Sequence, residues 1–232
     1  MGEGAVFISP RLTVGRRGVI AGIAAGATAA SAALLPRPAL AGIPASNQIA
    51  FEVFRNAKPI GAHSVTFTPA RAALEVRIQI DLVVRWAGLV LYRYAVRGNE
   101  TWRDGVLIAA QGETNDDGTR HAMRATRRDG RLLVEGTHGP SYVAPEKSIV
   151  STHWNPAQLG APMISVQDGQ LLDFRIDPRG RATITSRDAK VETDHFALSG
   201  PATLELWYDR RGVWSKLQAV SWEGSTIEYR PA

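Results

Sequence analysis

Hydrophobic and polar residues alternate along most of the chain after residue 46. The clearest run lies between Leu74 and Val84, where apolar side chains fall on one face and charged or amide side chains on the other. In extended conformation this run would span about 36 Å, at ~3.3 Å per residue. Strict alternation over that length predicts a half-buried β-strand. The same pattern recurs over residues 90–97 and 203–208.

Short turn signals separate these runs. Each pairs an acidic residue with a following glycine, and aspartate and glycine tolerate the positive φ angles that tight hairpin turns need. Short strands joined by such turns predict an antiparallel sandwich or barrel rather than parallel βαβ units. The signals include Asp104-Gly105, Asp117-Gly118, Asp129-Gly130, Asp168-Gly169 and Glu223-Gly224.

One segment of the chain, Pro145 to Leu159, lacks the alternation. Within it, Asn155 is suited to cap a helix, Pro156 to occupy its first position and Gly160 to follow its end. We therefore expect one short helix over residues 155–159. The predicted fold class is all-β: a strongly curved or closed antiparallel sheet of about ten strands, in the form of a half-barrel or barrel.

The N-terminus has the three parts of an export signal. A polar segment ends in Arg16-Arg17, a weakly apolar stretch rich in alanine and glycine follows, and Ala39-Leu40-Ala41 provides small residues for cleavage. An arginine pair ahead of a weakly apolar core is typical of twin-arginine signals. We expect the twin-arginine translocase as a partner, cleavage after Ala41, and a periplasmic protein.

This interpretation divides the chain into a signal peptide, residues 1–41, and a single β-barrel-like domain, residues 42–232. Two alternatives stay open. Gly18-Val19-Ile20 follows the arginine pair where an apolar Phe-Leu pair is usual, which leaves room for the Sec route. The apolar stretch is also about long enough for an uncleaved anchor, but alanine and glycine favour insertion only weakly. We expect no stable membrane span in the mature form.

Charge gives no indication of nucleic-acid binding. The chain has 27 basic and 22 acidic residues, and loss of the signal, with four arginines and one glutamate, lowers the net charge from +5 to +2. We therefore expect no nucleic-acid partner. The chain has no cysteine, which excludes disulfides, thiolate nucleophiles and cysteine-ligated metals.

No motif in the sequence assigns catalysis. The five histidines lack metal-ligand spacing, and no Gly-x-Ser-x-Gly motif is present. Asp116 and Asp117 belong to a turn signal, which explains them without chemistry. We assign no catalytic residue, no metal ligand and no cofactor.

Stretches 49–55, 59–61, 92–94, 100–105, 114–118, 154–156, 206–209 with Gly212, and 224–229 recur in a known order. In them the chain resembles a family of exported, twin-arginine-dependent bacterial proteins that is a domain of unknown function. The layout also resembles, more distantly, the half-barrels of lipoprotein-localisation factors, which wrap a curved sheet around a helix and an apolar cavity. The first resemblance implies no catalytic residues.

An eight-stranded barrel is just filled by its own side chains, so a larger one with little helix should enclose an apolar hollow. The leading hypothesis is therefore binding of a lipid or another apolar small molecule in the periplasm. The alternatives are a periplasmic hydrolase with carboxylates or His153 at the barrel mouth, and a structural or assembly module of the envelope. The predicted ligand-binding residues, with the helix after Trp154 as a lid, are Trp154, Tyr92, Ile78, Ile80, Leu204 and Leu206.

Overall fold

The longest predicted strand is present as β3, Leu74–Trp86, in which every second side chain from Leu74 to Val84 is buried. The computed structural model describes residues 42–70, 73–221 and 223–232. The predicted export signal, residues 1–41, lies outside the described residues. The alternation of the sequence thus marks the buried face correctly, because the same side chains point into the core of the sheet.

Thirteen strands form one large antiparallel sheet. Strands that pair in this sheet are consecutive in the chain, except that the last strand, β16, pairs with the first, β1. The consecutive sheet strands β8 and β12 lie at its two edges. In order across the sheet the strands are β12 (Arg175–Ser186), β13 (Ala189–Ser199), β14 (Thr203–Asp209), β15 (Trp214–Val220), β16 (Thr226–Pro231), β1 (Gln48–Arg55), β2 (Lys58–Pro69), β3 (Leu74–Trp86), β4 (Leu89–Arg103), β5 (Val106–Asp116), β6 (Thr119–Arg128), β7 (Arg131–Gly136) and β8 (Gly139–Val143).

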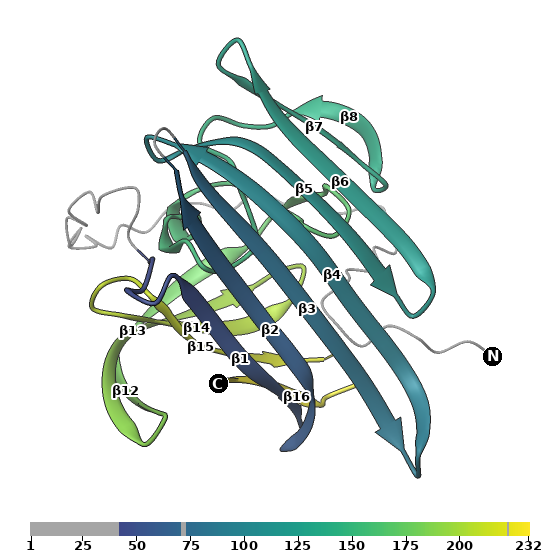
Figure 1. The fold of residues 1–232 in the computed structure, drawn as a ribbon, viewed down its shortest axis with the longest axis vertical. Helices are drawn as coiled ribbons and strands as arrows, with labels where there is room; N and C mark the ends of the chain where they lie inside the picture. The colour runs from purple at the N-terminus through teal and green to yellow at the C-terminus, as the bar shows by residue number, and fades with distance from the viewer. Residues whose placement is uncertain (1–41, 71–72, 222) are drawn as a thin grey trace, which may run out of the picture.

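The sheet is strongly curved and remains open. Strands β1 to β6 form the wall nearest the viewer, and β13 to β15 pass behind it (Figure 1). The edge strands β12 and β8 do not pair with each other. The predicted all-β fold with a curved antiparallel sheet is confirmed; of the two forms that the sequence left open, the half-barrel is correct, and it has thirteen strands where about ten were expected.

The predicted turns join consecutive strands. Asp104, Asp117 and Asp129 have φ angles of 48°, 47° and 50°, and the glycine after each also has a positive φ. Such a left-handed pair is the conformation that favours the Asp-Gly sequence in a tight hairpin.

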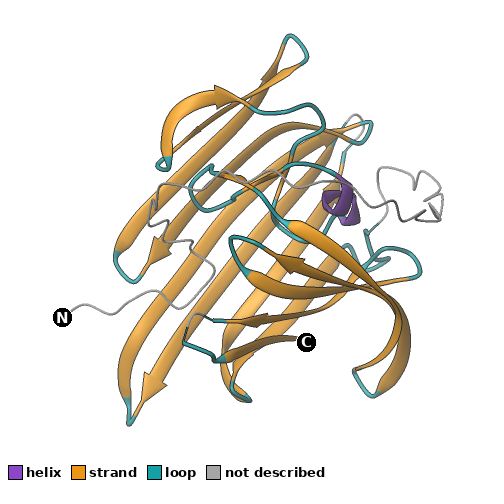
Figure 2. Cartoon of the chain, turned by 180° about the vertical axis from the view of Figure 1, so that it is seen from behind, coloured by secondary structure: helices purple, strands orange, loops and turns teal. Residues whose placement is uncertain are grey.

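A chain segment that we call the inner segment, residues 144–174, crosses the hollow face of the sheet (Figure 2). It contains the short strands β9 (Ile149–Val150), β10 (Met163–Ile164) and β11 (Leu171–Leu172), and the 3₁₀ helix η1 (Pro156–Gly160). Asn155 caps η1, since its side chain accepts a hydrogen bond from the backbone N–H of Ala157. The predicted helix is confirmed in position, one residue later at each end and 3₁₀ rather than α.

Two glycines in the sheet allow the inner segment to lie against the wall. A Cβ atom on Gly112 would meet the carbonyl oxygen of Val166 at 2.0 Å, and one on Gly136 would meet that of Asp168 at 2.1 Å. Real side chains cannot occupy that space, so the wall must carry glycine at both positions. The inner segment therefore lies directly against the wall, inside the hollow that the sequence led us to expect.

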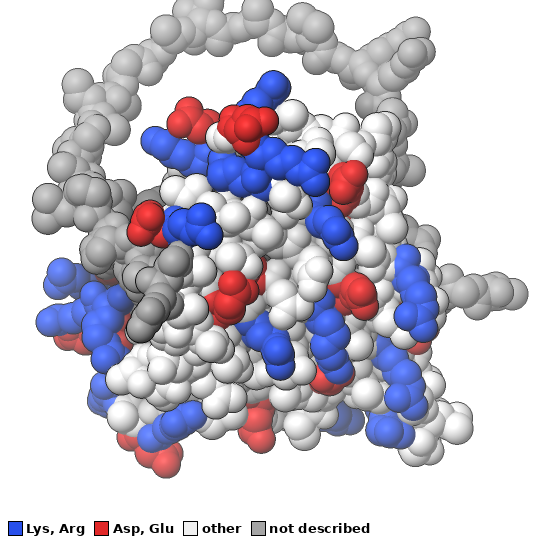
Figure 3. All heavy atoms as spheres, turned by 45° about the horizontal axis from the view of Figure 1, so that its top comes forward, with Lys and Arg blue, Asp and Glu red and all other residues white. Residues whose placement is uncertain are grey.

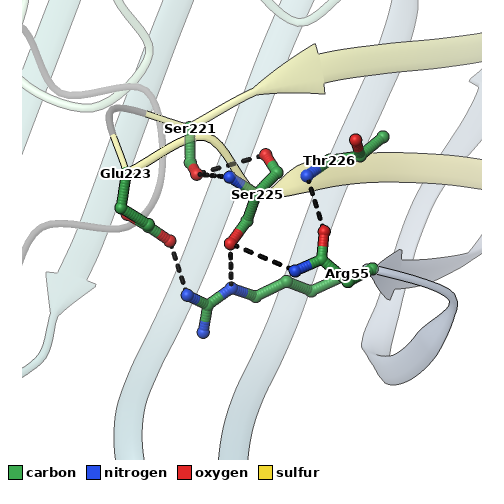
Figure 4. A network of polar contacts seen from close by, with 6 residues as sticks. Arg55, Ser221, Glu223, Ser225 and Thr226 are labelled. Atoms are coloured by element: carbon green, nitrogen blue, oxygen red, sulfur yellow. Dashed lines mark hydrogen bonds and ion pairs between the residues drawn. The ribbon is translucent and has the colours of Figure 1, made fainter.

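A polar cluster joins the turn after β1 to the turn before β16, although Arg55 and Ser225 lie 170 residues apart in the sequence. Arg55 donates to Oγ of Ser225 at 3.1 Å and to the carboxylate of Glu223 at 2.5 Å, and Asn56 accepts from the backbone N–H of Thr226 at 2.9 Å (Figure 4). These contacts hold the C-terminal hairpin beside the first strand and so keep the sheet continuous where β16 meets β1.

Charges of both signs lie on the face shown in Figure 3, where basic side chains form a band near one end of the molecule with acidic ones among them. None of the helical segments within the described residues has the length and hydrophobicity of a membrane span.

Candidate functional site

A cavity of about 80 Å³ lies between the sheet and the inner segment. The sheet contributes apolar side chains from β3, β14 and β15, and the inner segment contributes polar and apolar ones. Among the lining residues are Ile78, Ile80, Leu204, Leu217, Val166, Leu172, Phe174, Tyr94, Tyr229, Gln167, Ser151, His63 and His153. A mostly apolar hollow with a few polar groups is the usual form of a small-molecule site.

His63 is the most unusual of the lining residues. It lies on β2 in phase with the buried Val65 and Phe67, and its side chain is only 3% exposed. Among the described residues, no protein group forms a hydrogen bond with either of its ring nitrogens. Burial, reinforced by the nearby His153, lowers the pKa of His63 to about 3, so the imidazole is neutral at physiological pH.

A neutral imidazole has one N–H donor and one acceptor nitrogen. The ring of His63 lies edge-on against Trp214 and Tyr229, at centroid distances of 5.2 and 5.6 Å, so aromatic packing fixes its orientation. Buried polar atoms normally have a partner. His63 therefore presents unused hydrogen-bonding capacity at the wall of the cavity.

His153 lies opposite, on the inner segment, with a left-handed φ of 65°. Its Nδ1 is 3.3 Å from Oε1 of Gln158, whose amide nitrogen donates to the hydroxyl of Tyr208 at 2.6 Å. That hydroxyl in turn donates to the carbonyl of His153 at 2.8 Å. Burial lowers the pKa of His153 to about 4, although the Gln158 contact opposes the shift. His153 is thus a neutral ring, and the hydrogen bonds among His153, Gln158 and Tyr208 hold it in place. Its ring lies edge-on to that of Trp214, with a centroid distance of 5.7 Å.

A buried carboxyl group, Glu100 on β4, anchors the inner segment to the wall. Its two oxygens accept hydrogen bonds from Nε1 of Trp102 at 2.7 Å, from Nε1 of Trp154 at 3.0 Å and from the hydroxyl of Thr152 at 2.5 Å. Burial raises the pKa of Glu100, and the three hydrogen bonds partly oppose that shift. All three donors are buried. Through Thr152 and Trp154, this cluster therefore attaches the part of the inner segment just before η1 to strand β4.

The predicted ligand-binding residues divide into two groups. Ile78, Ile80 and Leu204 line the cavity. Tyr92, Leu206 and Trp154 are buried but are not among its lining residues. Trp154 is fully buried, and its ring packs edge-on against Trp102 and Phe67, at centroid distances of 5.5 and 5.2 Å.

The hydrolase alternative named His153 as a candidate residue at this site. Ser151 and His153 both line the cavity, but Nδ1 of His153 faces Gln158 rather than a serine hydroxyl. Within the described part of the chain, no three histidine or acidic side chains gather in a way that could hold a metal ion. The arrangement can hold a molecule and offer it a hydrogen bond.

Sequence reasoning missed both His63 and Glu100, although a signal for each was present. Both fall on the apolar phase of an alternating strand: His63 with Val65 and Phe67, Glu100 with Val96 and Trp102. A polar residue on the buried phase is expensive unless it has a partner or a function. That criterion would have singled out both positions from the sequence.

Comparison with known families identifies the chain. Residues 51–232 match the model of a domain of unknown function, DUF6134. Since this match spans most of the chain, the protein belongs to that family. It confirms the predicted membership of a domain of unknown function, while export by the twin-arginine route stays a prediction. No match was found among curated proteins.

Among solved structures, the chain is similar to a β-barrel-like protein of the domain of unknown function DUF1849 from Brucella abortus. The two share 6% sequence identity, and the match covers 80% of this chain and 95% of that one, with a TM-score of 0.56. At that identity the likeness concerns the fold alone. It agrees with the β-barrel-like architecture that the alternation predicts.

Proposed function

We propose that this DUF6134 protein binds a small, mainly apolar molecule carrying one hydrogen-bonding group, in the cavity between the sheet and the inner segment. The observation that carries the proposal is the buried, unpartnered imidazole of His63 at the wall of an otherwise largely apolar cavity. A ligand hydroxyl or carbonyl would satisfy that ring where the protein does not. The predicted contacts Ile78, Ile80 and Leu204 would pack against its apolar part.

The cavity volume limits the size of the ligand. A cavity of about 150 Å³ in another protein holds one benzene molecule, and this one measures about 80 Å³. A small molecule, or the end of a longer one, is therefore the appropriate ligand class. A complete acyl chain would require the inner segment to move, and that segment is attached to the wall through Glu100.

We expect the protein to prefer ethanol to propane, because the two have nearly the same shape, both are about half the size of benzene, and only ethanol can hydrogen-bond to His63. One added hydrogen bond in a buried site corresponds to roughly 1 kcal/mol, or about a fivefold difference in Kd. Two-dimensional NMR titration of the imidazole and Trp214 indole resonances would measure both affinities. A fluorescent fatty-acid analogue added as competitor tests whether an acyl chain occupies the same cavity.

The matched variants are His63→Phe and His138→Phe. His63→Phe keeps a flat ring at this position and should remove the preference for ethanol, while His138 is exposed at the turn between β7 and β8 and serves as the control. Equal affinity of the unmodified protein for ethanol and propane would contradict the role of His63. Failure of both to perturb the resonances of the lining residues would exclude the cavity as a binding site.

We also propose that the protein is exported by the twin-arginine translocase and acts in the periplasm. Replacing Arg16 and Arg17 by lysine should leave the precursor in the cytoplasm, because the machinery recognises the arginine pair. Cell fractionation with N-terminal sequencing gives the result, and the exported protein should begin at Gly42. Unchanged export of the double variant would point to the Sec route, and an intact N-terminus in the membrane fraction to an anchor.

A further inference from the structure

The turn between β3 and β4 exposes large hydrophobic side chains. Trp86 is 68% exposed, Leu89 65% and Leu91 56%, with Val90 beside them at 36%. Single exposed apolar residues are common on protein surfaces, but several on one projecting turn are not, and they mark interaction sites. The cavity does not explain them, because none of the four lines it.

This turn projects beyond the rest of the sheet. The pairing of β3 with β2 ends at Leu82, and that of β4 with β5 begins at Tyr94. The hairpin therefore continues past both neighbouring strands, and its turn is the lowest point of the molecule in Figure 1. Figure 2, seen from behind, shows the same projection. The exposed side chains lie on this free end, which we call the β3–β4 tip, residues 83–93.

The charged side chains of the tip itself are all basic, while Asp117 of the neighbouring β5–β6 turn accepts a hydrogen bond from the backbone N–H of Arg93 at 3.2 Å. No acidic residue occurs in the sequence between Asp81 and Glu100. Arg85 and Arg93 flank the apolar side chains and are exposed, and the third arginine of the stretch, Arg97, forms an ion pair with Asp81 at 2.7 Å. The tip thus combines apolar side chains at its end with two cationic ones behind them.

We propose that the β3–β4 tip docks onto an anionic lipid membrane. Tryptophan favours the boundary between acyl chains and headgroups, and each arginine near an anionic surface adds attraction. A protein partner fits less well, because a standard interface buries about 800 Å² on each side and the tip is a narrow, convex end of two strands. Trp86, Leu89 and Leu91 would enter the bilayer boundary while Arg85 and Arg93 contact phosphate groups. This proposal is independent of the cavity and its ligand.

The absence of cysteine in the chain allows a site-specific test with the full-length protein. Leu89→Cys, labelled with an environment-sensitive fluorophore, reports on the tip, and Thr68→Cys reports on the opposite end of the sheet, where Thr68 is exposed and pairs with Glu75. On addition of phosphatidylglycerol vesicles we expect roughly a twofold or greater rise in emission, with a blue shift, at position 89 alone. Phosphatidylcholine vesicles should give a weaker response.

Trp86→Ser with Leu91→Ser, introduced into the labelled Leu89→Cys protein, should weaken vesicle binding at least about tenfold. Both residues are exposed, so circular dichroism should be unchanged. Equal responses at positions 68 and 89 would overturn the proposal, because the whole molecule rather than the tip would then meet the membrane. A response at position 89 that depends on protein concentration without vesicles would overturn it in favour of self-association.

Discussion

Replacing Glu100 by alanine should lower the free energy of unfolding by about 3–5 kcal/mol. The substitution leaves the indole N–H groups of Trp102 and Trp154 and the hydroxyl of Thr152 without their acceptor inside the core. Each unpartnered buried donor costs about 1–3 kcal/mol. In a domain of this size, the melting temperature should fall by roughly 6–20 °C. Guanidinium and thermal unfolding curves measure both quantities.

Glu100→Gln separates hydrogen bonding from charge. The amide keeps an oxygen that can accept from both indoles and gains a donor for Thr152. Because burial raises the pKa of Glu100, the neutral amide should cost far less than alanine. Glu113→Ala, on the exposed face of β5, is the control and should change stability by less than about 0.5 kcal/mol. Equal losses for Gln and Ala would show that the negative charge itself is required.

The architecture could be predicted because its signals are local. Alternation over Leu74–Val84 follows from side chains that point in turn to the core and to solvent. The turns at Asp104, Asp117 and Asp129 follow from the conformational preferences of aspartate and glycine. These signals give strands and hairpins, but they carry no information on how far the sheet curves. Closure depends on whether the edge strands β12 and β8 pair, which no local pattern in either strand shows.

The site could be predicted only in part, for the same reason. The inward side chains of β3, Ile78 and Ile80, were expected in the hollow and do line the cavity. The position of the inner segment inside that hollow depends on contacts between distant residues, such as Gly112 with Val166, that no periodicity shows. Trp154 was expected at a lid, whereas its indole belongs to the Glu100 cluster.

The two cavity histidines predict a marked sensitivity to acid. The pKa values of His63 and His153 are about 3 and about 4 in the folded protein, against 6.5 ordinarily. Below pH 6.5 the unfolded chain binds protons that the folded protein does not, so their contribution to stability is complete above pH 6.5 and declines as pH falls toward the folded values. At pH 5 the loss should be of order 2 kcal/mol for each histidine.

His63→Phe should remove about half of this loss. From pH 7.5 to pH 5 we expect the unmodified protein to lose roughly 2 kcal/mol more stability than the variant. Guanidinium unfolding at both pH values measures the difference, with an unchanged m value confirming the same transition. Glu100 titrates in the opposite sense, since its raised pKa stabilises the fold as pH falls. That contribution is common to both proteins and cancels in the comparison. Equal losses of stability in the unmodified protein and the variant would mean that His63 is protonated in the folded state and that its ring is not sealed from water.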